Sequence, residues 1–254
     1  KSIRMTWITA DFPGLPPEAR SKVKAFITCR DDGVSKAQFD SLNIALHVGD
    51  SITEVRANRA ILRDELKLPS EPFWLHQTHS NCVLNVPYEY RPELAADASF
   101  TSSIENVCAV MTADCLPLLI VNQEATEVAV VHAGWRGLAT GIIEQTIASM
   151  ASSASSLHVY LGPAIGPESF EVGEEVRRAF VESNSEFSSC FNQAPEEGKF
   201  MANLYQLARI KLQHLGVVHI TGGHYCTYKQ SDLFYSYRRD GQTGRMASLI
   251  WLES

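Results

Sequence analysis

The 254-residue chain lacks the features that mark exported, membrane-bound or polyanion-binding proteins. Its six cysteines form no CxxC pair, and a chain of this length does not need disulfide staples, so we expect reduced thiols. No apolar run is long enough to cross a bilayer, and prolines 13, 16 and 17 interrupt the order expected of a signal peptide. The formal charge of −7 argues against non-specific binding to nucleic acid or anionic membranes. We therefore expect a cytoplasmic protein with neither type of partner.

The sequence also lacks internal repeats and low-complexity linkers. Hydrophobic residues make up 45% of the chain and charged residues 20%, which is ordinary for a soluble protein with a substantial core. One large domain and two closely packed halves both fit this composition.

Apolar patterns indicate a mixture of strands and helices. Short apolar segments at 73–86, 107–121 and 127–135 are typical of strands, and apolar residues at helical spacing predict helices over 137–150, 171–184 and 203–215. Asp50 or Ser51 is expected to cap a further helix that begins just after it. Near the C-terminus, strands are expected in HITGGHYCTY, LFYSYRRD and ASLIWL.

One apolar segment, VCAVMTADCLPLLIV at 107–121, is interrupted by polar residues and a proline. Thr112, Asp114 and Cys115 lie where a buried strand would hold apolar side chains, and Pro117 follows them. An unpartnered buried polar group costs about 1 to 3 kcal/mol, and a bare carboxylate costs more. The interruption therefore predicts a compensating partner for these side chains.

Histidines at the ends of two other strand-like segments offer such a partner. LHQTHS carries His76 and His79, and VAVVHAGWRG places His132 directly after four apolar residues. One thiolate and two imidazoles are ligands that Zn²⁺ takes in an open catalytic site, with Asp114 as an outer carboxylate or proton carrier. No HxxxH or CxxC signature ties them together, so ordinary packing of Cys115 and the histidines stays open. Asp114 favours the metal site, because a merely packed strand does not need it.

Two further segments carry candidate anion-binding groups. The loop YLGPAIGPESFEVGEEV at 160–176 places backbone amides before a helix, but its glutamates would repel phosphate, so a plain connection is favoured. FYSYRRDGQTGRMASLIWL at 234–252 contains Arg238, Arg239 and Arg245. These arginines form either a substrate clamp or a charged hairpin with a solvated face, and the sequence favours the hairpin.

Six motifs follow one another along the chain: GVSKAQFDSLNIALHVGD, HQTHS, CAVMTADCLPLL, AVVHAGWRGL, LGPAIGPESFEVGEEV and YSYRRDGQTGRMASLIWL. From about Gly33 to Trp251 the sequence closely resembles the bacterial YfiH family, whose members have been called polyphenol oxidase, laccase-like protein, peptidoglycan editing factor and purine nucleoside phosphorylase. The resemblance implies an α+β fold, a four-layer α/β/β/α sandwich with mixed sheets, in a single domain over residues 1–254. The implied fold is similar to the catalytic domain of the cytotoxic necrotizing factor deamidases.

The resemblance also implies a metal site. Its ligands fall on His79, Cys115 and His132, with His79 rather than His76 matching the family's Q-x-H pattern. The expected ion is Zn²⁺, with Cu²⁺ as the other choice.

The family's activity implies phosphorolysis of adenosine, inosine and methylthioadenosine, together with deamination of adenosine. Its partners would be a small-molecule nucleoside and phosphate, and the protein is expected to be a monomer or weak homodimer. We expect Asp114 and Cys115 to be catalytic. Arg136 is expected to contact an anionic substrate group, and Asn43 and Gln77 to donate or accept hydrogen bonds with the substrate.

Three other functions remain open at this stage. A multicopper laccase fits poorly because the chain has no HxH pair, although a His₂Cys site can hold a single copper ion. A cysteine hydrolase would use Cys115 as nucleophile and His132 as base, with peptidoglycan precursors as its substrates. A zinc-stabilised binding protein would need the metal to stay folded.

Overall fold

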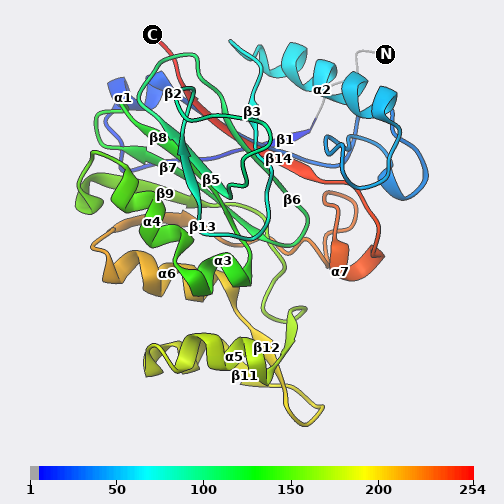
Figure 1. Cartoon of the computed structure of the whole chain (residues 1–254), viewed down its shortest axis with the longest axis vertical. Coiled ribbons are helices and arrows are strands. Elements are labelled where there is room, and N and C mark those ends of the chain that lie inside the picture. Colours follow the sequence, from blue (N-terminus) through cyan, green and yellow to red (C-terminus); the bar gives the residue numbers. More distant parts are fainter. Residues whose placement is uncertain (1–5) are drawn as a thin grey trace.

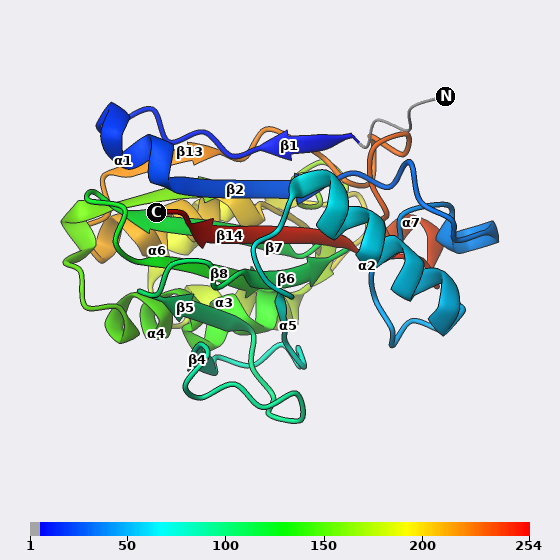
Figure 2. The same ribbon diagram turned by 90° about the horizontal axis from the view of Figure 1, so that it is seen from above.

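Two mixed β-sheets face each other at the centre of the protein, in a computed structural model that describes residues 6–254. The first has five strands in the order β1 (Trp7–Thr9), β2 (Val23–Thr28), β14 (Met246–Leu252), β6 (Cys108–Thr112) and β3 (Phe73–Trp74). Figure 2 shows β1, β2, β14 and β6 side by side. The pairs are antiparallel except for the edge pair of β3 and β6.

The second sheet has six strands in the order β13 (His219–Gly222), β9 (Leu157–Leu161), β7 (Leu116–Asn122), β8 (Val128–Ala133), β5 (Ala98–Thr101) and β4 (Val83–Asn85). Its two edge pairs are parallel and its inner pairs are antiparallel. Every residue of β7 is buried, with Leu118 packed toward helices and Leu119 toward the first sheet. This double burial explains why β7 reads as a continuous apolar run.

Helices cover the outer faces of both sheets. The helix α2 (Ile52–Leu66) packs on the five-stranded sheet, and α3 (Trp135–Thr140), α4 (Ile142–Ser149) and α6 (Leu204–His214) pack on the six-stranded sheet (Figure 1). A third apolar cluster fills the space between the two sheets. The α+β fold and the four layers expected from the resemblance are thereby confirmed.

A smaller unit extends beyond α6. A three-stranded sheet of β10 (Glu171–Gly173), β12 (Lys199–Ala202) and β11 (Phe191–Gln193) lies beside α5 (Glu174–Val181) at the bottom of Figure 1. The remaining α-helices are the short α1 (Pro17–Lys22) and α7 (Tyr237–Asp240), and three 3-10 helices span Ala37–Phe39, Ala154–Ser156 and Ser185–Cys190. In the described part of the chain, no helix has both the length and the apolar character required to span a membrane.

Several expected elements differ in the structure. The helix predicted over 137–150 is two helices, because Gly141 adopts a positive φ of 92° and ends α3. The helix predicted over 171–184 begins as the strand β10, and the strand predicted in LFYSYRRD is a loop followed by α7. Ser51 does cap α2, since its side chain accepts a hydrogen bond from the Glu54 amide.

Candidate metal centre and cavity

The polar interruption at 107–121 is the place where the chain passes from one sheet to the other. The strand β6 ends at Thr112 in the five-stranded sheet, and β7 begins at Leu116 in the six-stranded sheet. Between them Asp114 adopts a positive φ of 88°, which turns the backbone sharply. The crossing places Cys115 directly before the start of β7, so the expected single strand is in fact two.

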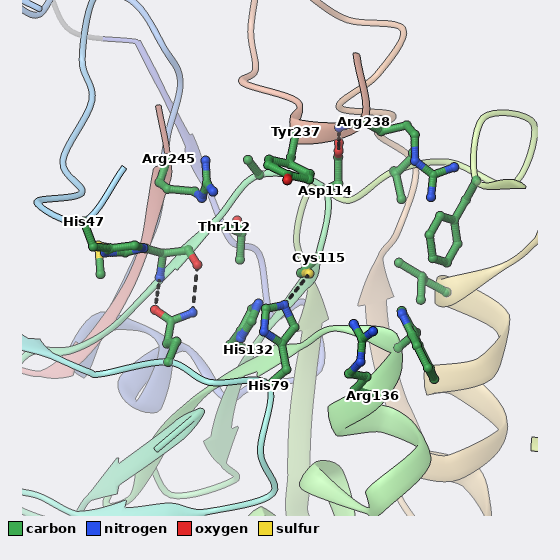
Figure 3. Close-up of a pocket in the computed structure, with 17 residues that line it drawn as sticks. His47, His79, Thr112, Asp114, Cys115, His132, Arg136, Tyr237, Arg238 and Arg245 are labelled. Carbon is green, nitrogen blue, oxygen red and sulfur yellow. Dashed lines mark hydrogen bonds between the residues drawn. The ribbon is translucent and has the colours of Figure 1, made fainter. Parts of the chain in front are cut away.

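The three expected metal ligands meet at this crossing. His132 lies on β8 opposite Pro117, the second residue of β7, and His79 comes from the loop between β3 and β4. The nitrogen and sulfur ligand atoms of His79, Cys115 and His132 all lie within 4.8 Å of one another. Nε2 of His79 is 3.8 Å from Sγ of Cys115, and the two imidazole rings are 4.8 Å apart (Figure 3).

A buried carboxylate that sequence reasoning missed orients this cluster. Asp97 is fully buried and accepts a hydrogen bond of 2.7 Å from Nδ1 of His132. It also accepts hydrogen bonds from the backbone amides of Thr78, His79 and Ser80. Because Nδ1 of His132 is engaged in this way, its Nε2 is free to bind a metal ion. Asp97 directly precedes β5, a strand that the apolar patterns did not predict, so nothing in the sequence marked this residue.

Electrostatics at the cluster favour a thiolate and an ionised carboxylate. Burial opposes ionisation of Cys115, but the charge of His132 and hydrogen bonds from both histidines outweigh it and lower the pKa of the thiol to about 6. Burial likewise opposes the charge on Asp97, yet hydrogen bonds from His132 and Ser80 bring its pKa down to about 2. Burial opposes the charge on His132 as well, but the Cys115 thiolate and the Asp97 carboxylate outweigh it and raise the pKa of His132 to about 9. Without an ion the thiolate is therefore paired with a protonated His132, and a metal cation would take the place of that proton.

The close packing of the cluster depends on a glycine. A Cβ at Gly134 would lie 2.9 Å from Cδ2 of His79 and 3.0 Å from Sγ of Cys115. One thiolate and two imidazoles within these distances suit Zn²⁺, whose ligand bonds are about 2.0 to 2.3 Å, and they suit copper as well. The donor set therefore fits the expected metal, which these three side chains would hold at the wall of the cavity.

A cavity of about 470 Å³ opens in front of the cluster (Figure 3). Its apolar lining includes Trp135, Ile165, Phe170 and Leu204. Its polar lining, besides the three candidate ligands, consists of His47, Gln77, Thr112, Asp114, Arg136, Tyr237, Arg238 and Arg245.

The expected substrate residues occupy different environments. Arg136 is an exposed residue of the cavity wall, and its guanidinium lies 4.5 Å from the ring centre of Trp135. Gln77 also lines the cavity, but its amide exchanges two hydrogen bonds of 2.8 Å with the backbone of Met111. His76 is exposed and lies outside both the ligand cluster and the cavity lining.

Asn43 is fully buried and lies behind the cavity wall rather than in it. Its Oδ1 accepts hydrogen bonds from the amides of Ala45 and Arg245, and its Nδ2 donates to Asp50. With its amide used in this way, Asn43 has no group left for direct contact with a substrate. The structure thus replaces the expected contact with a supporting position beneath Arg245.

Asp114 is also committed to neighbouring protein groups. One carboxylate oxygen accepts a hydrogen bond of 2.6 Å from the Thr227 hydroxyl. The other accepts hydrogen bonds from the Ser236 hydroxyl and, at 2.7 Å, from the Arg238 amide. These contacts tie the crossing between the sheets to the start of α7. These contacts fit the first of the two roles that the sequence left open for Asp114, an outer carboxylate rather than a proton carrier, and its catalytic role stays a prediction.

The favoured interpretation of the last arginines, a charged hairpin with a solvated face, is wrong. Arg238 lies in α7 and Arg245 directly precedes β14, and both line the cavity. Arg239 instead donates to the backbone carbonyls of Thr227, Tyr228 and Phe234, which anchors the loop. Sequence spacing alone carried no signal that would separate these three roles.

Comparison with known proteins gives the same assignment as the motifs. Residues 24–253 match the family model described as multi-copper polyphenol oxidoreductase laccase. A Shigella flexneri protein named purine nucleoside phosphorylase YfiH is 48% identical over 91% of this chain and 94% of its own length. The chain belongs to the YfiH family. A second YfiH relative, from Pseudomonas aeruginosa and also named a purine nucleoside phosphorylase, is 46% identical over 97% of the chain and 98% of its own length.

Solved structures of YfiH relatives share the whole fold. A crystal structure of a Neisseria meningitidis protein of the DUF152 family superimposes with a TM-score of 0.90 at 45% identity, covering 98% of this chain and 99% of the other. YfiH from Bacillus licheniformis gives a TM-score of 0.84 at 31% identity and covers 91% of this chain and 93% of its own.

Proposed function

We propose that this YfiH-family protein is a metal-dependent purine nucleoside phosphorylase that acts on adenosine, inosine and methylthioadenosine. The observation that carries the proposal is the His79, Cys115 and His132 cluster opening into a cavity lined by three arginines. The names of the relatives at 46% and 48% identity support the same activity. The metal is proposed to be Zn²⁺, which when bound would supply a Lewis acid and an activated water.

Phosphorolysis places two demands on this cavity. The N-glycosidic bond breaks with positive charge developing on the ribose, and a phosphate dianion must be held close to C1′. The cavity contains Arg136, Arg238 and Arg245 against a single carboxylate, Asp114, whose oxygens are already hydrogen-bonded. This excess of positive charge suits an anionic co-substrate. Gln77 and Arg136 are proposed as further substrate contacts because both line the cavity.

We propose adenosine deamination as a further activity of the same cavity. That reaction adds water at C6 of the purine and releases ammonia, so it does not consume phosphate. A volume of about 470 Å³ is within the range of pockets that hold a small molecule such as a nucleoside.

A paired assay tests both activities. Purine release from inosine and ammonia release from adenosine are measured with and without phosphate, on protein as purified, after chelation, and after addition of zinc. We expect purine release to require phosphate and both activities to fall on chelation and return with zinc. Undiminished purine release without phosphate, with free ribose as product, would instead identify a nucleoside hydrolase.

Copper-dependent polyphenol oxidation is the second candidate, favoured by the family description and by the His₂Cys donor set. Metal analysis of the purified protein separates the two. A stoichiometric copper content with an intense blue absorption would favour oxidation, whereas a colourless protein with zinc favours the phosphorylase.

A further inference from the structure

Arg245 is a partly buried cation whose guanidinium forms no salt bridge with a carboxylate of the described chain. Its Nη1 donates to the carbonyls of Thr243 and Gly244 at 2.8 and 2.9 Å. No protein acceptor within residues 6–254 takes a hydrogen bond from its Nε or Nη2. Removing a guanidinium from water is costly unless an acceptor or a negative charge meets it. Because Arg245 lines the cavity, that acceptor is expected to be a ligand.

The backbone beneath Arg245 is rigidly held. Its amide donates a hydrogen bond of 3.0 Å to Oδ1 of Asn43. Asn43 is fully buried and donates a hydrogen bond of 2.9 Å to Asp50. A side chain supported by such a network is ordered before the ligand arrives, so less entropy is lost on binding.

Thr112 adds an unused hydroxyl beside this arginine. The residue is 2% exposed, lines the cavity, and pairs with Met246, the residue after Arg245. Its Oγ1 is buried and makes no hydrogen bond with any described residue. A buried hydroxyl without a partner is unfavourable, and an oxygen of a bound anion would provide one.

His47, an exposed residue, completes this end of the cavity. The negative charges of Cys115 and Asp114 act on Arg245, but neither group forms a salt bridge with it. Partial burial, followed by the charges of Arg245 and Arg59 and by His76, lowers the pKa of His47. Arg59 does not line the cavity. Its guanidinium donates a hydrogen bond of 2.9 Å to the carbonyl of Ile44 and lies 4.2 Å from the ring centre of Trp74. Arg245 is therefore the cation presented to the cavity here.

The opposite end of the cavity has a different chemistry. Arg136 lies against Trp135, and the guanidinium of Arg238 is 5.3 Å from the ring centre of Phe170. Both arginines are exposed, so water screens their charge, and Ile165 and Leu204 add apolar surface. Flat aromatic and guanidinium surfaces suit a purine ring better than a phosphate ion. Figure 3 shows His47 and Arg245 on one side of the metal-ligand cluster and Arg136 on the other.

We propose that Arg245, Thr112 and His47 form an oxyanion recess that binds the attacking phosphate, while the aromatic end holds the purine. The inference rests on the proposed phosphorylase function and moves the anion-binding role expected of Arg136 to Arg245. A phosphate oxygen forms a bond to C1′, and the bond from C1′ to N9 breaks with its electron pair passing to the purine. The proton of hydrogen phosphate ends on the released base, which leaves ribose 1-phosphate.

Direct binding of inorganic phosphate tests the recess without relying on turnover. Calorimetric titrations are run on the metal-loaded wild type, Arg245→Gln, Thr112→Val and the matched control Arg136→Gln, with and without hypoxanthine. Melting temperatures confirm that each variant is folded. Thr112→Val keeps the side-chain shape and removes only the hydroxyl, so it tests the recess even if Arg245→Gln is unstable.

We expect phosphate affinity to fall about tenfold or more in Arg245→Gln and several-fold in Thr112→Val, and to stay within about twofold in Arg136→Gln. Steady-state kinetics should follow the same order, with KM for phosphate raised in the first two variants and KM for inosine raised in Arg136→Gln. Loss of phosphate binding in Arg136→Gln alone would overturn the proposal. So would a wild type that binds no phosphate either with or without hypoxanthine. Phosphate binding that depends on Arg245 in a protein that releases purine without phosphate would instead refute only the phosphorylase function.

Discussion

At the scale of single residues, Asp97 links the metal-ligand cluster to the loop that supplies one of its members. Its carboxylate holds Nδ1 of His132 and the amides of Thr78, His79 and Ser80 at the same time. This arrangement fixes the imidazole of His132 and positions the backbone of His79, whose φ is +62°. A non-glycine residue in that conformation requires support from its surroundings.

We predict that Asp97→Asn weakens metal binding by about 10- to 100-fold, because an amide cannot accept from all these donors or stabilise the His132 proton in the same way. The measurement is competition with a chromophoric zinc chelator. Asp232→Asn, which changes an exposed carboxylate outside the cavity lining, is the control and should bind zinc like the wild type. Equal zinc affinity in both variants would refute the orienting role of Asp97.

A second residue-scale prediction concerns His158, which is 2% exposed and stacked 4.3 Å from His219. Burial, and then the charge of His219, lowers the pKa of His158 to about 4, against 6.5 in an unperturbed side chain. Between these values the unfolded chain binds a proton that the folded protein does not. The free energy of unfolding should therefore decrease as pH falls from about 6.5 to about 4, by up to about 3 kcal/mol from this group.

Urea denaturation across this pH range provides the test, with the curve for His158→Gln compared with wild type. The variant should show a shallower loss of stability toward pH 4, whatever its stability at neutral pH. His224→Gln, at an exposed loop histidine, should keep the wild-type slope. Parallel curves for wild type and His158→Gln would contradict the assignment.

At the scale of elements, the sequence predicted part of the crossing from β6 to β7 but not all of it. The apolar run interrupted by Asp114 and Cys115 correctly predicted compensating partners for these groups, because burying them without partners is unfavourable. The same run did not reveal that its two halves belong to different sheets, since buried strands of either sheet are equally apolar. Nor did it reveal that the partners of Asp114 come from residues 227 to 238, more than a hundred positions away.

We predict that Asp114→Asn lowers the free energy of unfolding by about 1 to 3 kcal/mol and reduces activity through looser placement of Arg238 and Cys115. An amide at this position would leave at least one of the Thr227, Ser236 and Arg238 donors poorly paired. Chemical denaturation and kinetics on the same preparation check this. Full stability with complete loss of turnover would instead support proton transfer by Asp114.

At the scale of the whole molecule, the order of motifs along the chain led to the family and the fold, while the cavity could not be derived in the same way. Its walls come from β6, β8, α3, α6, α7 and intervening loops, so residues as distant in sequence as His47 and Phe170 come to line one cavity only in three dimensions. Gly134 illustrates the difference, because HAGWRG marks the family but only the packing shows why a glycine stands beside Cys115. Long-range contacts of this kind leave no periodic pattern in a single sequence.

The measurement closest to the central claim follows phosphate itself during the reaction. Inosine and inorganic phosphate are incubated with wild type or Cys115→Ser, and ³¹P NMR records the products. The proposed phosphorylase function predicts a growing ribose 1-phosphate signal with the wild type. With Cys115→Ser it predicts no such signal and reduced zinc content, at a melting temperature close to that of the wild type, because the change replaces only a sulfur by an oxygen at a partly exposed cavity residue and removes no apolar side chain from the core. Ribose 1-phosphate formed equally by both proteins, or free ribose as the only sugar product of the wild type, would contradict it.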